Sequence, residues 1–517
     1  MNFFRKYNRT KNLHRPPISS QNQQKTPLPT FISKSVSENI SMVHTHFTLA
    51  PDLIVKKMVI QQTGSHAALV YMSGLANQMV INDYVLTSLL FKEETKNKSE
   101  DLKVLLGHQQ EATTWFEIEN AIFQGNSVLF VENHTNVFIF NTPGYPQRQV
   151  GDSQLEPSLR GSHEGFVETG SQNIAMIRRH LPNLDLKIKE ATVGKRGKTK
   201  ISILYLADVA NPEVLQVLEK RIQELDVDMI LNTGVLGELI EDNPYSPLPQ
   251  FIITERPDFA ALQISLGRIV TVVDDSPSVL IGPASFTSFF QNIDDYGSRW
   301  MVASFIRLLR YVAFFIAVFL PSIYIAVISL HIEVIPLKLL LSIGESRDRV
   351  PFPPLLEAFF MEITLEVLRE SGLRLPAPIG QSIGIVGGIV IGQAAVEAGI
   401  VSNIMVIIVA LTAIASFIIP NYDMGSALRI IRFPMMVVAS IFGFVGITIG
   451  FMIFIGHFIA LESLGTPYGS PLAPIRFSEW KDVFIRFPQR TLVNRPFSTR
   501  ATQLRRAKNN PSKGDKH

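Results

Sequence analysis

The sequence contains no cysteine among its 517 residues. That absence excludes disulfide bonds, thiolate metal ligands and a cysteine nucleophile, and it leaves the redox compartment undetermined. The sequence also lacks an HExxH motif, a P-loop, a GxGxxG or GxSxG pattern and a kinase signature. We therefore expect no catalytic site, no metal site and no cofactor, and we do not expect the chain to be an enzyme.

The N-terminus lacks the apolar core of a secretory signal peptide. It reads MNFFRKYNRTKNLHRPP, which is basic, and the first forty residues are rich in Asn, Gln, Ser, Pro and Lys. A segment with so few large apolar residues buries too little surface to fold alone. We expect a flexible lead-in over residues 1–44, followed by an N-terminal region that stays in the cytoplasm.

Long apolar runs are nearly absent before residue 300 and frequent between residues 301 and 470. A membrane-spanning helix needs roughly 20 apolar residues, and four stretches qualify. Pro321 lies inside the first stretch and predicts a kink rather than an interruption. The four expected spans are residues 311–330, 375–396, 398–422 and 433–461, with a tight hairpin at Glu397.

Positive charge follows the last apolar run. Residues 476–517 contain eleven Lys or Arg against three acidic residues. Nucleic-acid binding is the usual alternative for such a tail, but its place directly after a hydrophobic span favours a cytoplasmic anchor on membrane lipid. If the tail and residues 299–310 share the cytoplasmic side, the number of spans is even. A helix at 354–370 would then be interfacial, re-entrant or buried in a vestibule, while Arg429 and Arg432 fit poorly with an extracytoplasmic loop.

Elsewhere the alternation of strands and helices predicts two α/β subdomains, at residues 45–182 and 183–295. A helical membrane domain at 296–475 and a basic cytoplasmic tail at 476–517 would complete the chain. The predicted fold is thus an α/β cytoplasmic region followed by an α-helical integral membrane domain with about four to five membrane segments. The elements expected in the first subdomain are a helical stretch from 47 to 91, strands at 127–131 and 136–140, and a helix from Gly170. Those expected in the second are strands at 186–191, 201–206, 251–254, 268–273 and 279–281, and helices at 211–225 and 258–266.

A carboxylate-rich helix precedes the second apolar run. Glu362, Glu366 and Glu370 are four residues apart and share a helical face, and Glu357 lies one turn before them. One interpretation is an ordinary solvated or salt-bridged face, paired with Arg369 and Arg374. The other is a water-filled ion path containing Glu357, Glu362 and Glu366, because carboxylates beside membrane segments are costly unless they face protein or water. Carboxylate rings in an oligomer would favour cations.

Glycines recur at a four-residue spacing in the apolar run that follows. Gly380, Gly384, Gly388 and Gly392 leave one helical face as bare backbone, so that another helix can approach closely. That neighbour belongs either to the same subunit or to another subunit of an oligomer.

Two polar motifs stand out in the second subdomain. In TERPD, Arg256 lies between Glu255 and Asp258 and is expected to form a structural ion-pair turn. Asp274 and Asp275 follow a strand, but adjacent strand residues point to opposite faces. We therefore do not expect these two aspartates to form a metal or phosphoryl-transfer site.

A longer series of motifs resembles the A subunits of the GerA-type spore germinant receptors of endospore-forming bacteria. The resemblance covers roughly residues 45–490 in collinear order. One departure is that the family typically has glycine where Asp275 stands. The matching motifs are GFVET at 165–169, IRRH at 177–180, SPLPQ and TERPD within 246–258, DDSPSVLIGP at 274–283, PFPPLLEAFFMEITLEVLRESGLRLP at 351–376, IGQSIGIVGGIVIGQAAVEAGIVSN at 379–403, TAIASFIIP at 412–420 and LGTPYGSPLAPIRF at 464–477.

The resemblance implies a receptor subunit in the spore inner membrane, with its α/β domain in the cytoplasm. It also implies two partners, a transporter-like B subunit that senses the nutrient and a lipoprotein C subunit. The A subunits would oligomerise into an ion-conducting ring that opens when nutrient is sensed. A non-conducting scaffold or signal-relay subunit of the same receptor remains the alternative, and no nucleic-acid partner is expected.

Overall fold

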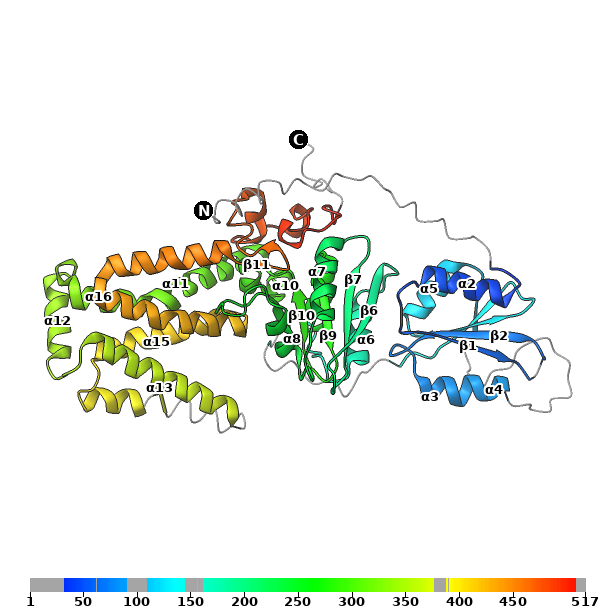
Figure 1. The fold of residues 1–517 in the computed structure, drawn as a ribbon, viewed down its shortest axis with the longest axis horizontal. Coiled ribbons are helices and arrows are strands. Elements are labelled where there is room, and N and C mark those ends of the chain that lie inside the picture. The colour runs from blue at the N-terminus through cyan, green and yellow to red at the C-terminus, as the bar shows by residue number, and fades with distance from the viewer. Residues whose placement is uncertain are drawn as a thin grey trace. The chain divides into compact units, whose positions relative to one another are not determined.

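The computed structural model describes residues 32–61, 63–90, 109–144, 156, 161–375, 387–388 and 390–507. The chain forms two compact units that divide between Tyr145 and Pro146. The first unit contains one five-stranded sheet. The second contains another five-stranded sheet together with the helical region (Figure 1).

The first sheet is antiparallel throughout, in the order β1-β2-β4-β5-β3. Helices α2 and α5 cover one face, and α3, a π-helical turn and α4 lie on the other (Figure 1). Strands β4 and β5 confirm the two strands predicted from the sequence. The bounds are β1 Leu53–Val59, β2 His66–Met72, β3 Gln109–Ala112, β4 Ser127–Val131, β5 Val137–Phe140, α2 Val36–His46, α3 Gln78–Val80, the π turn Ile81–Leu86, α4 Thr87–Leu90 and α5 Trp115–Phe123.

The helical stretch expected from residue 47 to 91 is wrong for its first half, because β1 and β2 form a β-hairpin there. Their register runs from Leu53 opposite Met72 to Val59 opposite His66. Strand β2 is buried on both faces apart from His66, so it lacks the polar–apolar alternation that identifies a half-buried strand. Gly64 at the reversal has a φ of +71°, a conformation that glycine adopts without strain.

The second sheet is also antiparallel, in the order β6-β7-β9-β10-β8. Helices α6 and α9 pack on one face and α7 and α8 on the other. All five strands and both helices predicted for the second subdomain are confirmed. The bounds are β6 Leu186–Val193, β7 Thr199–Leu206, β8 Ile252–Thr254, β9 Ile269–Val273, β10 Val279–Gly282, α6 Gly170–His180, α7 Pro212–Gln223, α8 Thr233–Ile240 and α9 Pro257–Ser265.

Helix α6 begins at Gly170 as predicted, but it packs on the second sheet rather than within the first subdomain. Ile174, Met176 and Ile177 belong to the same apolar core as β6 and β9. The Gly170 N–H donates to Asp274 Oδ1 at 2.8 Å, which satisfies one free donor at the helix N-terminus. The apolar face of α6 therefore finds its partner in the sheet that follows it in the chain.

The helical region consists of helices that lie alongside one another (Figure 1). Two of them, α11 and α16, are long and apolar enough to cross a membrane, and α15 is a shorter apolar helix. The number of membrane segments remains a prediction, and residues 376–386 and 389 of the second expected span lie outside the described residues. The bounds are α11 Trp300–Leu330, α12 Leu337–Arg347, α13 Pro354–Arg374, α15 Asn403–Ile418 and α16 Tyr422–Ala460.

Helix α16 doubles back at Gly443, so residues 433–461 do not form the single straight span that we expected. Gly443 has φ 59° and ψ −137°, which is not helical. An ideal Cβ on Gly450 would lie only 2.5 Å from Met435 Sδ. In a continuous helix these residues would be about 22 Å apart at 1.5 Å per residue, so the two halves of α16 must pack side by side. An uninterrupted apolar run does not reveal such a turn, because glycine is common in membrane helices.

The second sheet and the helical region share one apolar core, which includes Phe286, Phe290, Phe314 and Phe458. The C-terminal segment returns to the same sheet. Asn211 Nδ2 donates to Arg500 O at 3.1 Å, and Thr502 N donates to Val209 O at 2.8 Å. The chain therefore leaves this sheet, forms the helical region and comes back to the sheet.

Candidate functional site

The glutamates predicted for an ion path lie on α13 in different surroundings. The exposed fraction is 1% for Glu357 and 5% for Glu362, so both are buried in the helical region. The side chain of Glu366 is 47% exposed. The regular spacing seen in the sequence therefore does not place these carboxylates in one environment.

Glu357 links α13 to two neighbouring segments. Its Oε1 lies 3.0 Å from Arg347 Nη2 at the end of α12. Its Oε2 accepts a hydrogen bond from Ser402 N at 3.0 Å. Ser402 is the N-cap of α15, and its side chain accepts from Met405 N. Glu357 thus helps to fix the start of α15.

Glu362 pairs with Arg432 of α16, and both side chains are almost fully buried. Arg432 also donates from Nε to Ala317 O at 2.7 Å and from Nη2 to Ser416 Oγ at 3.3 Å. One guanidinium therefore contacts three other helices, which are α11, α13 and α15.

Glu366 contacts two arginines. The nearest atoms are Arg369 Nη1 at 3.4 Å and Arg429 Nε at 3.2 Å. Arg429 and Arg432 fitted poorly with the loop that the sequence suggested, and the structure places them within the first half of α16, facing α13. Glu370 forms an exposed pair with Arg374 at 2.7 Å. We call the contacts of Glu357, Glu362 and Glu366 with these arginines the α13 pairs.

Each predicted ion-path glutamate thus has an arginine partner within its own chain. A charge in an apolar environment is tolerated when it is paired and hydrogen-bonded. This favours the salt-bridged interpretation for a single chain. The part of these glutamates in conduction remains a prediction, because ion flow would depend on an assembly.

Only part of the predicted glycine face can be examined. Gly380 and Gly384 lie outside the described residues. Among the described residues, no atom comes within 4 Å of an ideal Cβ on Gly388, and Gly392 has only Val406 Cγ1 at 3.8 Å. The tight contact falls instead on Gly387, whose Cβ would lie 2.7 Å from Leu368 Cδ2 of α13. Gly388 therefore has space for a neighbour that the described chain does not fill.

A second buried charge network lies at the start of α11, and the sequence did not suggest it. Asp295 Oδ2 accepts from Arg307 Nε at 2.9 Å and from Arg310 Nη1 at 2.8 Å. Arg307 Nη1 also reaches Asp482 Oδ1 at 2.9 Å. We call Asp295, Arg307, Arg310 and Asp482 the junction network, because it ties α11 to segments outside the helices.

Tyr296 completes the junction network. Its hydroxyl donates to Asp482 Oδ2 at 3.1 Å, and the Arg307 guanidinium lies 5.4 Å from its ring centroid. Burial, together with the negative charge of Asp482, raises the pKa of Tyr296 to about 12. The phenol therefore remains a hydrogen-bond donor throughout the physiological pH range.

The polar motifs of the second sheet have local contacts. Arg256 donates from Nε and Nη2 to the two oxygens of Asp258 at 3.1 and 2.7 Å, and the backbone oxygen of Glu255 accepts from Phe166 N at 2.7 Å. Asp274 Oδ1 binds the start of α6, as described above. Asp275 has a φ of 62°, a conformation that glycine adopts without strain.

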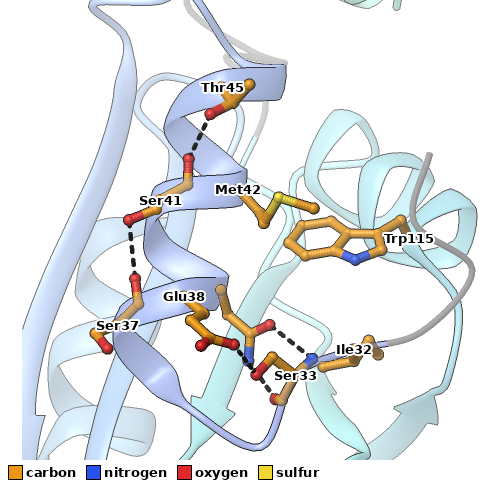
Figure 2. A pocket seen from close by; sticks show the side chains of 9 residues that line it. Ile32, Ser33, Ser37, Glu38, Ser41, Met42, Thr45 and Trp115 are labelled. Atoms are coloured by element: carbon orange, nitrogen blue, oxygen red, sulfur yellow. Dashed lines mark hydrogen bonds between the residues drawn. The ribbon is translucent and has the colours of Figure 1, made fainter. Parts of the chain in front are cut away.

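The first unit has a shallow pocket of about 590 Å³ between α2 and α5 (Figure 2). Ile32, Met42 and Trp115 form its apolar wall, and hydroxyl groups line α2. Ser41 and Thr45 donate their hydroxyls to backbone oxygens one turn earlier. These hydroxyls are therefore already engaged as donors within the helix.

The comparisons with known proteins agree with one another. A family model described as "Bacillus/Clostridium GerA spore germination protein" matches residues 41–498. Spore germination protein KA of Bacillus subtilis (strain 168) is 38% identical over 482 residues, which cover 92% of this chain and 89% of that protein. Spore germination protein GerLA of Bacillus cereus is 37% identical over 451 residues, or 86% and 92% of the two chains.

One further relative and one solved structure are also similar to the chain. The uncharacterized membrane protein YfkQ of Bacillus subtilis (strain 168) is 39% identical over 469 residues, which cover 90% of this chain and 91% of that protein. A crystal structure of the N-terminal domain of the A subunit of the Bacillus megaterium spore germinant receptor GerK3 is 28% identical, with a TM-score of 0.39, and covers 50% of this chain and 98% of that chain. The match of one family model to nearly the whole chain, together with these full-length relatives, shows that the chain belongs to the GerA family of spore germination proteins.

Proposed function

We propose that this chain is the A subunit of a nutrient germinant receptor in the spore inner membrane, and that it acts with a B and a C subunit. Family membership supports the role in germination. The observation that carries the membrane location is the distribution of side chains in the helical region, where charges are paired inside and large apolar side chains point outward. Such a surface suits lipid and is unusual for a soluble protein. Exposed examples on α11, α13, α15 and both halves of α16 are Phe305, Ile363, Phe417, Ile430 and Ile453.

The path of the chain supports a cytoplasmic location for both the second sheet and the tail. The tail from residue 495 to 502 is hydrogen-bonded to the loop between β7 and α7 and to the end of α9, beside this sheet. The two must therefore lie on the same side of a membrane, and the helices between them must cross it an even number of times. The excess of positive charge in the tail supports the cytoplasm as that side.

The finer proposal is that A subunits form a ring that conducts ions when nutrient is sensed. The open space beside Gly388 supports it, because a helix of a neighbouring subunit could approach there. Glu357, Glu362 and Glu366 would give the ring its preference for cations.

The alternative is a scaffold that relays the signal without conducting. Two observations favour it: the glutamates are paired within the chain, and the second sheet and the helices share one core. A movement of the sheet would then reach the helices directly.

Ion flux separates the two functions. The purified full-length chain in liposomes should carry a cation flux if it conducts, and none if it only relays. In spores, Glu362→Gln plus Glu366→Gln at matched receptor abundance should slow potassium release after nutrient addition. A Glu370→Gln variant, which alters an exposed pair, is the matched control. Unchanged release in the double variant would remove the glutamates from the path.

Assembly can be tested at Gly388. Gly388→Leu should leave the single chain folded, because a side chain there meets no described atom within 4 Å. It should nevertheless prevent oligomer formation in detergent, as measured by particle mass. Gly344, which also has open space around it, offers the control substitution Gly344→Leu. A Gly388→Leu chain of normal oligomeric mass would contradict packing between subunits at this glycine.

A further inference from the structure

Pro321 leaves one carbonyl of α11 without its normal donor. In an α-helix the carbonyl of residue 317 accepts from the N–H of residue 321, and proline has no N–H. Ala317 and Pro321 are both buried. Among apolar groups an unpaired backbone carbonyl is strongly unfavourable. A donor from outside the helix is therefore needed at this point.

Arg432 of α16 is that donor. Its Nε lies 2.7 Å from Ala317 O. The approach is possible because α11 and α15 pack through small residues here, namely Ala313, Ala317 and Ala415. The exposed fraction of Arg432 is 2%, so its guanidinium is held by its neighbours and is not free to turn toward solvent.

The same guanidinium also contacts Glu362 of α13 and Ser416 of α15. Three acceptors from three helices thus share one planar group. Arginine suits this position because its donors form a rigid fork. A lysine would keep the charge but could not serve three acceptors with the same geometry.

We propose that Arg432 is the positioning residue of the helical region: the carbonyl freed by Pro321 fixes the guanidinium, and the guanidinium fixes Glu362. The part that concerns Glu362 and ion flow rests on the proposed function. The joining of α11, α13, α15 and α16 rests on the geometry alone. The two parts need separate experiments.

A double-mutant cycle tests the role of Pro321. The thermal unfolding midpoint of the full-length chain in detergent is measured for Arg432→Met, Pro321→Ala and both together. Arg432→Met should lower the midpoint strongly in the native background. The loss should be clearly smaller with Pro321→Ala, because residue 321 then supplies the N–H for Ala317 O.

Equal losses in the two backgrounds would overturn the link between Pro321 and Arg432. Arg374→Met is the matched control, because Arg374 is 78% exposed and its pair with Glu370 lies on the surface. It should change the midpoint little in either background.

Potassium release from spores tests whether Arg432 acts by positioning Glu362. At matched receptor abundance, Arg432→Gln and Glu362→Gln should each slow release, and the double variant should be no slower than Glu362→Gln alone. Additive slowing would show that Arg432 acts independently and would overturn the positioning role. Arg432→Lys should remain slow, and full rescue by lysine would contradict the need for a planar fork.

The two proposals can fail separately. A normal release rate in Glu362→Gln would overturn the role of Glu362 in the proposed ion path. The unfolding cycle would still decide whether Arg432 joins the helices, because it does not depend on ion flow.

Discussion

The junction network and the α13 pairs use the same chemistry for different purposes. Both bury arginine against carboxylate. In the junction network, however, the carboxylates of Asp295 and Asp482 come from segments before and after the helices. In the α13 pairs, Glu362 and Glu366 contact Arg432 and Arg429, which both lie on helix α16. The first arrangement joins the start of α11 to the segments that precede and follow the helices in the sequence, and the second holds the helices to one another.

The two regions also differ in how many arginines one carboxylate oxygen contacts. Asp295 Oδ2 accepts from two arginines, whereas Glu362 and Glu357 each face one arginine. Removing Asp295 takes the carboxylate away from Arg310 and leaves Arg307 with Asp482 alone. We therefore expect stability to depend more on the junction network than on any one α13 pair.

The largest effect should come from Asp295→Asn. An asparagine keeps the shape but not the charge, so Arg307 and Arg310 lose their common partner. Breaking a buried ion pair costs about 3–5 kcal/mol, and we expect a loss in that range for the free energy of unfolding of the full-length chain in detergent. A loss below that of Glu357→Gln would reverse the proposed ranking of the two regions.

Glu357→Gln should have an intermediate effect. Glutamine can still accept from Ser402 N, but it no longer balances the charge of Arg347. Because the arginine side chain is 17% exposed, water can replace part of the interaction, and we expect a cost of about 1–3 kcal/mol. Hydrogen exchange at the start of α15 should stay slow, and rapid exchange there would mean that the Ser402 contact was also lost.

A pH titration of stability tests a buried carboxylate of another kind, Glu241, which accepts a hydrogen bond from an amide instead of pairing with an arginine. Glu241 accepts from Gln250 N at 3.2 Å, and burial, with further contributions from Glu238, Asp423 and Asp242, raises its pKa to about 7. The folded chain then retains a proton that the unfolded chain loses near pH 4.5, so stability should fall as the pH rises from about 4.5 to about 7.

Glu241→Gln tests this directly. The variant should lose that part of the pH dependence, as measured by unfolding midpoints at several pH values. Glu370→Gln, which does not touch Glu241, should retain it. An unchanged pH profile in Glu241→Gln would assign the dependence to another group.

The smallest effect should come from Glu370→Gln. Both side chains of the Glu370–Arg374 pair are more than half exposed, and exposed pairs four residues apart on a helix contribute only about 0.3–0.5 kcal/mol. A change in unfolding free energy above about 1 kcal/mol would mean that the charge has a buried partner in the assembled protein.

Local patterns predicted much of the fold. The strands of the second sheet and the helices at 212–223 and 257–265 follow from short-range periodicity and turn residues. The β1–β2 hairpin could not be recognised in the same way, because burial on both faces removes the alternation of β2. Gly443 could not be distinguished from other glycines in an apolar run, although it reverses the chain.

The candidate site was predictable in position and in its local pairs, Glu366–Arg369 and Glu370–Arg374, but not in its long-range contacts. The spacing of the glutamates placed them on one helix. The long-range partners are distant in sequence: Arg432 is separated from Glu362 by 70 residues, and in the junction network Asp482 is separated from Arg307 by 175. No local pattern connects such positions. The need for a donor at Ala317 could have been read from Pro321, because the missing N–H is a property of the sequence.

The hydrogen bonds of the tail beside the second sheet can form only when the tail and the sheet lie on the same side of a membrane. Residues 495–502 are synthesised after all the helices, yet they form hydrogen bonds with the loop between β7 and α7, which precedes the helices. A chain whose helices crossed the membrane an odd number of times would carry its tail on the opposite side from that sheet. Its Asn211 and Val209 contacts would stay unmade, so only chains with an even number of crossings can form these hydrogen bonds.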